Sequence, residues 1–219
     1  MNTDRANPNY PQWVDRPDTA GAAESPDRPI RATDILAAAL ERFAAYGLEA
    51  TSLRDIAREA GVSIGLIQHH FGHKRKLVEA VDQHVLRVLR AAVVGPLTQQ
   101  FGNPASEQGH RVVNLVTDHS IEVQYLARAF ADGRELSSQV FDLLAEQGIT
   151  RWHDYEAQGL TKPDTDATWA ALNLVLIFLG AVTMRSHLDR HLPAPLTTPG
   201  QLHRWETSVN RTINDGMLK

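Results

Sequence analysis

From about residue 30 to the end of the chain, apolar residues recur at intervals of three and four positions with hardly an interruption. That spacing is typical of one face of an α-helix, and the strict alternation of a half-buried strand never persists. Glycine and proline interrupt the pattern at Gly95-Pro96, Gly102/Pro104, Gly133, Gly159/Pro163 and Pro193/Pro195. We therefore expect an all-α fold of about nine helices.

The first 28 residues differ from the rest. They contain Pro8, Pro11, Pro17 and Pro26 and few aliphatic residues. Such a stretch buries too little apolar surface to offset the entropy of ordering it. We expect a disordered arm over 1–28, followed by a small module over 29–76 and a helical domain over 77–219.

Three short helices are expected in the small module, over 32–46, 52–60 and 63–70. Gly47 suits a left-handed C-terminal cap, and Ser63 suits an N-terminal cap. Ser52 and Asp55 have the spacing of a capping box with a shorter acid. Because Gly61 separates the second helix from the third, the pattern indicates a helix-turn-helix unit.

The later helices are expected over 74–94, 105–117, 120–131, 135–158, 164–190 and 198–214. Of these, 164–190 is apolar nearly all round, which indicates that one face meets the core and another meets a partner or a larger core. Val175 and Leu179 are the interface positions that this pattern suggests.

Composition excludes several classes of protein. The chain has no cysteine, so a disulfide framework, a thiolate nucleophile or a cysteine metal site is impossible. The most apolar run, 167–184, contains Asn173, ends at Arg185 and falls short of the roughly 20 residues of a membrane span. The amino terminus has no apolar signal core. We expect a cytoplasmic protein without a membrane segment.

Charge is uneven along the chain. The net charge is −4, yet residues 28–90 hold ten Lys and Arg against seven Asp and Glu. A locally basic module on an acidic body suits a DNA-binding end.

Two segments and one lysine carry a family resemblance. Residues 44–57 (AAYGLEATSLRDIA), 60–71 (AGVSIGLIQHHF) and Lys74 resemble the signature of the TetR (tetracycline-repressor) family. The resemblance implies a DNA-binding homodimer, with its last two helices forming a four-helix interface and its middle helices enclosing a ligand pocket. It also implies that ligand binding swings the fourth helix and releases a palindromic operator. No catalytic residue, cofactor or metal is expected.

The third helix is the expected recognition helix. Val62, Ile67 and Phe71 face inward. Gln68 suits an adenine edge, and Ile64 or Leu66 suits thymine methyl groups unless one packs under the first helix. The resemblance matches Ser52 and Lys74 to positions that hold phosphates. The complete set of expected DNA contacts is Ser52, Arg54, Ser63, Ile64, Leu66, Gln68, His69, His70 and Lys74.

Arg54 and the histidines have alternative interpretations. Arg54 contacts DNA or forms a surface pair with Asp55 or Glu59. His69, His70 and His73 could be mistaken for a metal site, although the DNA face explains them without one.

The expected ligand pocket rests on apolar side chains of the middle helices, which could also be ordinary core. His119, His153 and Tyr125 are candidate polar contacts. Since no Arg/Lys cluster occurs there, a neutral or largely apolar effector is expected. The pocket candidates are Leu126, Phe130, Phe141, Leu144, Trp152 and Tyr155.

Two other classes of protein stay open. An enzyme would need His153-Asp154 or His187 with His191, neither of which has the local context of a known catalytic motif. A ligand-independent DNA-binding or architectural protein, or an activator, would use the same helix-turn-helix. Arg28 and Arg31 could enter a minor groove, but the arm as a whole is acidic and suits a tether better.

Overall fold

The computed structural model describes residues 32–94 and 104–218, and these consist of helices joined by turns. The prediction of an all-α fold is confirmed. The expected arm over 1–28, Arg28, Arg31 and the Gly95-Pro96 break lie outside the described residues. The helices are α1 (Ala32–Tyr46), α2 (Leu53–Glu59), α3 (Ile64–Phe71), α4 (Lys74–Val93), α5 (Pro104–Asp118), α6 (Ser120–Ala131), α7 (Glu135–Ala157), α8 (Ala167–Thr183), α9 (Arg185–Leu188), the 3₁₀ turn η2 (Asp189–His191) and α10 (Pro199–Met217).

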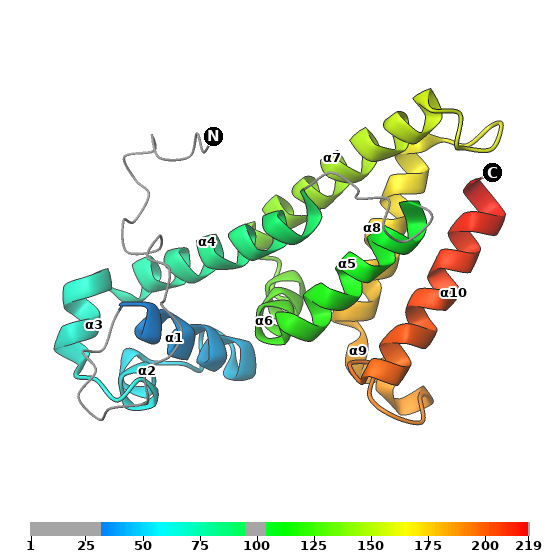
Figure 1. The fold of residues 1–219 in the computed structure, drawn as a ribbon. Helices are drawn as coiled ribbons and strands as arrows, with labels where there is room; N and C mark the ends of the chain where they lie inside the picture. The colour runs from blue at the N-terminus through cyan, green and yellow to red at the C-terminus, as the bar shows by residue number, and fades with distance from the viewer. Residues whose placement is uncertain (1–31, 95–103, 219) are drawn as a thin grey trace, which may run out of the picture.

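The molecule is elongated. Figure 1 shows α1–α3 gathered at one end, which we call the head, with α4 leading from it towards the body formed by α5–α10. Every fourth residue of α4 is buried, namely Leu77, Val81, Val85 and Leu89. These residues belong to one core that continues from Ile35 in α1 to Leu202 in α10. The fourth helix is therefore packed into the head and the body at once.

The expected single helix over 164–190 is wrong. The α8 helix ends at Thr183, and the segment from Arg185 to His191 departs from it at an angle of 71°. The Thr183 hydroxyl donates to the Leu179 carbonyl at 2.7 Å, a type of back-bond that accompanies helix bends. The break explains why the described residues form more helices than the expected nine.

A second, smaller cluster closes the far end of the body. Trp152 and Tyr155 of α7 pack there with Ala167 of α8 and Ile213 of α10. The end of α10 is held by the Lys162 amide, which donates to the Met217 carbonyl at 2.9 Å. No single helix in 32–94 or 104–218 is long and apolar enough to cross a membrane, and only the bent pair of α8 with the following segment approaches that composition.

Candidate DNA-binding head and ligand cavity

The α2 helix begins with a complete capping box, as predicted. The Ser52 hydroxyl oxygen accepts from the Asp55 amide at 3.3 Å, and an Asp55 carboxylate oxygen accepts from the Ser52 amide at 3.0 Å. The Ser52 hydroxyl also donates to that carboxylate at 2.6 Å. This side-chain hydrogen bond is the main reason that the pKa of Asp55 is lowered. Ser52 is exposed, but its proton is committed to Asp55, so donation to a phosphate would require its hydroxyl to rotate.

The turn before α3 and the cap of α3 also follow the predicted pattern. Gly61 adopts a φ of 65°, and the Val62 amide donates to the Ala57 carbonyl at 2.9 Å. The Ser63 hydroxyl accepts from the Leu66 amide at 3.2 Å and caps α3. Ile67 is the buried residue of α3 and faces the core of the head. Local hydrogen bonds therefore set the angle between the two helices.

The candidate contacts on α3 divide into two groups. Gln68, His69 and His70 are exposed, whereas Ile64 and Leu66 are half-buried and pack against the core. Both aliphatic side chains thus have a structural role, which reduces the surface that they offer to thymine methyl groups. In the described parts of the chain, no group of three His, Asp or Glu side chains is arranged to hold a metal ion.

The basic candidates also separate by environment. Arg54 is exposed, and no side chain among the described residues forms an ion pair or hydrogen bond with it. Its expected alternative partners are engaged elsewhere, since Asp55 pairs with Arg58 at 3.0 Å and Glu59 with Arg42 at 3.9 Å. Arg54 is therefore available to an external anion.

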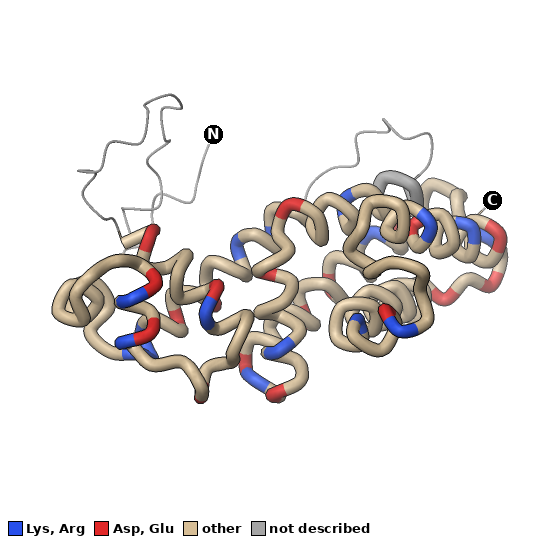
Figure 2. The backbone as a smooth tube through the Cα atoms, turned by 90° about the horizontal axis from the view of Figure 1, so that it is seen from below, with Lys and Arg blue, Asp and Glu red and all other residues tan. Residues whose placement is uncertain are grey.

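Lys74 differs from Arg54. Its side chain is half-buried, and its ammonium group donates to the Leu48 carbonyl, which ties the start of α4 to the turn after α1. The neighbouring exposed cations, Arg75 and Lys76, both contact Glu79. Figure 2 shows acidic and basic positions mixed along the head rather than gathered in one block.

Polar contacts connect the body with the end of α1 and with α4, and the sequence pattern did not predict them. The Arg128 guanidinium on α6 donates to the Ala44 carbonyl at 2.6 Å and to the Ala45 carbonyl at 2.5 Å, at the end of α1. The Tyr125 hydroxyl, also on α6, donates to Asp82 of α4 at 2.6 Å. Arg134 donates to both oxygens of the same carboxylate at 2.8 Å. Burial is the main cause of the raised pKa of Tyr125.

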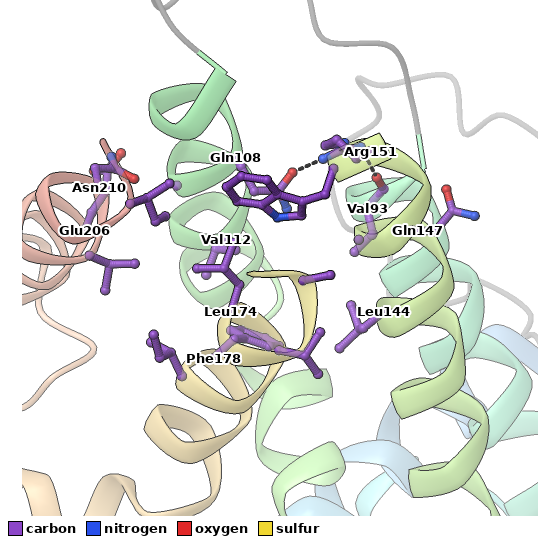
Figure 3. Close-up of a pocket in the computed structure, with 18 of the residues that line it drawn as sticks. Val93, Gln108, Val112, Leu144, Gln147, Arg151, Leu174, Phe178, Glu206 and Asn210 are labelled. Carbon is purple, nitrogen blue, oxygen red and sulfur yellow. Dashed lines mark hydrogen bonds between the residues drawn. The ribbon is translucent and has the colours of Figure 1, made fainter. Parts of the chain in front are cut away.

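An apolar cavity of about 1050 Å³, its mouth included, lies between α5, α7, α8 and α10 (Figure 3). Three pocket candidates, Leu144, Trp152 and Tyr155, line it. Leu126 does not, because it is buried in the main core, and neither do Phe130 and Phe141, which pack against that core. The pocket thus lies nearer to α10 than the sequence interpretation placed it.

The polar candidates for the pocket also lie elsewhere. Tyr125 bonds Asp82, His119 lies 3.7 Å from Glu122, and His153 is exposed beside Glu156. The cavity is instead lined by polar residues from five other positions, which sequence spacing alone did not single out: Gln108, Gln147, Arg151, Glu206 and Asn210.

These polar residues close the ends of the cavity. Figure 3 shows Arg151 of α7 donating to the Gln108 side chain of α5 and to the Val93 carbonyl at the end of α4, the latter at 3.2 Å. On the opposite side, Gly109 of α5 lies against Asn210 of α10, and a Cβ added there would come within 2.9 Å of the Asn210 amide. Glycine at this position therefore allows α5 and α10 to approach closely.

One face of α8 carries an exposed apolar stripe. Trp169, Leu176 and Met184 recur at about two helical turns and are 58%, 54% and 54% exposed. Val175 and Leu179 are only 7% and 6% exposed, so their selection as interface positions is wrong: they face the core of their own chain. The exposed apolar surface of α8 lies on a neighbouring face of the helix.

Comparisons with known proteins agree with the fold and with the head. The family model described as bacterial regulatory proteins, tetR family, matches residues 35–81. The HTH-type transcriptional regulator BetI of Ectopseudomonas mendocina is 44% identical over 66 residues, which are 30% of this chain and 34% of that protein. BetI of Burkholderia thailandensis is 42% identical over 65 residues. The match therefore spans about a third of the length of these curated relatives.

Solved structures resemble the fold of most of the chain, head and body together. A gamma-butyrolactone receptor (ArpA-like protein) has a TM-score of 0.67 at 20% identity, over 85% of this chain and 87% of that chain. A protein from Saccharomonospora viridis, solved in complex with choline, has a TM-score of 0.66 at 20% identity, over 85% and 97%. At such identities the likeness concerns the fold alone.

Proposed function

Because the chain belongs to the tetR family of bacterial regulatory proteins, we propose that it is a transcriptional regulator that binds double-stranded DNA and has no catalytic activity. The observation that carries this proposal is the capped α2–turn–α3 unit, with Gln68 exposed on α3 and with Arg54 on α2 exposed and unpaired among the described residues. An amide can bind adenine in bidentate fashion, and a free guanidinium can bind guanine or phosphate. Such a protein works in the cytoplasm, beside the chromosome.

The regulator acts as a homodimer. The exposed apolar side chains of Trp169, Leu176 and Met184 support this, since large exposed apolar residues on one helix face are typical of a protein interface. A twofold dimer carries two heads, and a symmetric pair of recognition helices binds half-sites that are one or more helical turns apart. The operator is therefore a palindrome.

The effector is a small, largely apolar molecule that enters the cavity between α5, α7, α8 and α10. The apolar lining supports this assignment, with Leu144, Trp152, Leu174 and Phe178 among its residues. The cavity touches Val93 at the end of α4, the helix whose other end enters the head. Occupation of the cavity moves α4 and releases the operator, which makes the protein a repressor.

Selection of bound sequences from random duplex DNA tests the first part of the proposal. We expect a palindrome to be enriched. The matched control is an Arg54→Ala, Gln68→Ala double variant, which removes two exposed side chains and should enrich the palindrome much less. If a folded, dimeric wild-type protein enriches no sequence, the DNA-binding function is wrong.

A thermal-shift screen with neutral, apolar compounds tests the effector. A compound that binds only the folded protein raises its melting temperature. The matched variant is Leu174→Trp, whose larger indole would protrude into the cavity and collide with a bound compound, so it should lose the shift. A shift that survives in this variant would place the compound elsewhere, and a hit without effect on operator binding would exclude it as an effector.

A further inference from the structure

A second cavity of about 990 Å³, its mouth included, lies on the other side of Phe178 and Trp205 from the first. These two side chains line both cavities. The second cavity is bounded by α6, by the bend between α8 and α9, and by the turn that leads into α10. It is more polar than the first cavity, and its two charged residues are both positive.

The charged side chains that line this second cavity are both arginines, Arg128 and Arg185, and no Asp or Glu is among its described lining residues. Arg185 is half-buried at the bend, and nothing in the described parts of the chain pairs with it. A partly desolvated guanidinium without a counter-charge favours an anion, above all a planar carboxylate that it can bind through two N–H groups.

The rest of the lining defines the shape of the anion. Ser120, Ser186 and Thr197 add hydroxyl groups to the lining, together with Thr183, whose hydroxyl donates to the Leu179 carbonyl. The floor is apolar and is formed by Leu196, Leu202 and Phe178, which are all buried. A carboxylate at the arginines with a short aliphatic tail over this floor would satisfy both halves of the cavity, whereas inorganic phosphate would leave the floor uncovered.

Arg128 gives this site a link to the head. Its Nε and one terminal nitrogen donate to the carbonyls of Ala44 and Ala45. A guanidinium has five N–H donors, so others remain for a carboxylate. A bound carboxylate therefore either shares Arg128 with α1 or draws it away from α1, and both change the contact that holds the head to the body.

We propose that this second cavity binds a small amphipathic carboxylate through Arg185 and Arg128, and that its occupation loosens the end of α1. The site is separate from the cavity assigned above to a neutral effector. Its binding reaction requires no DNA, so it can be tested whether or not the chain is a regulator.

The test is isothermal titration of the full chain with octanoate, octanol and inorganic phosphate. We expect saturable octanoate binding that Arg185→Gln weakens by about tenfold or more, as for the loss of a charge-assisted pair. The matched control is Arg211→Gln, which removes an exposed arginine of α10 and should bind octanoate like the wild type. Arg185→Lys should retain part of the affinity, since it keeps the charge.

Two further comparisons make the result specific. The Leu174→Trp variant, with an indole obstructing the first cavity, should keep octanoate binding while it loses octanol binding. Hydrogen exchange at the end of α1 should accelerate when octanoate binds. Octanoate binding that is absent, unchanged in Arg185→Gln or abolished in Leu174→Trp would overturn the proposal, and so would phosphate binding as tight as that of octanoate.

Discussion

Gly61 shows how much of the head depends on one backbone angle. Its φ of 65° lies in the left-handed region, and a Cβ added there would meet no atom within 4 Å. Gly61→Ala should therefore lower the free energy of unfolding by about 1 kcal/mol, through backbone strain alone. Gly65→Ala, inside α3, should raise it by about 0.5–1 kcal/mol, because alanine is the better helix former. Urea denaturation measures the unfolding free energy of both variants. Equal changes in the two variants would contradict the role of the positive φ angle of Gly61.

Gln68 and Arg54 should differ in what they contribute to DNA binding. Gln68→Ala should relax base choice at one position of each half-site, because an amide can bind the edge of adenine. Arg54→Ala should weaken all sequences alike if it contacts phosphate, and lower the salt dependence by about one unit per subunit. Binding titrations against single-base operator variants at several salt concentrations separate the two. Unchanged specificity in Gln68→Ala would remove that residue from the base contacts.

At the scale of one element, the same substitution should have different effects on the exposed face and on the buried face of α8. Leu176→Glu places a charge on the exposed stripe and should yield a folded monomer. Leu179→Glu places the same charge in the core and should destabilise the fold by several kcal/mol, because no partner is there to compensate it. Light scattering and circular dichroism distinguish the outcomes. A folded Leu176→Glu protein that stays dimeric would move the interface away from α8.

The contact between α4 and α6 should make stability depend on pH. A hydrogen bond from His84, 3.0 Å away, is the main reason that the pKa of Glu122 is lowered from its ordinary value of 4.5. A carboxyl with a depressed pKa adds stability above its ordinary pKa, and this stability is lost as the pH falls through the lower folded value. Glu122→Gln should therefore be less stable than the wild type near neutral pH, and the difference should shrink below pH 4.5.

Chemical denaturation across the acid range checks this expectation. The control is Glu156→Gln, which removes the exposed partner of His153 on α7 and should change little, since surface pairs contribute weakly. A difference between Glu122→Gln and the wild type that grows in acid would have the wrong sign for this mechanism.

At the scale of the whole molecule, removal of the Arg128 side chain should allow the head to unfold independently of the body. Replacement by leucine removes two hydrogen bonds from a charged donor, and the unfolding free energy should fall by about 2–3 kcal/mol. Amide exchange should accelerate in α1–α3 and stay unchanged in α7, because the head then opens on its own. Uniform acceleration over all helices would indicate that the core through α4 alone couples the two ends.

The parts that could be predicted from the sequence are those with short-range causes. Ser52 caps an amide three residues away, and Gly61 needs only its own φ angle. The helices, their caps and the helix-turn-helix followed from such signals.

The contacts that were missed join distant positions. Tyr125 and Asp82 are 43 residues apart, Lys74 and Leu48 are 26 apart, and Arg128 and Ala44 are 84 apart. The faces of α8 were misjudged for a related reason. An all-apolar helix has no polar side to identify its exposed face, so only the packing of α7 and α6 decides that Val175 points inward.

The bond between Arg128 and α1 has a consequence for how such proteins diverge. Arg128 donates to two main-chain oxygens, which every amino acid supplies, and to no side chain of the head. Ala45 is exposed, so its side chain can change without loss of this hydrogen bond, whereas Ala44 is buried in the main core and must stay small. Recognition helices of other sequences can therefore be carried on one body as long as the apolar packing of α1 on α6 is kept, and a designer can graft them in the same way.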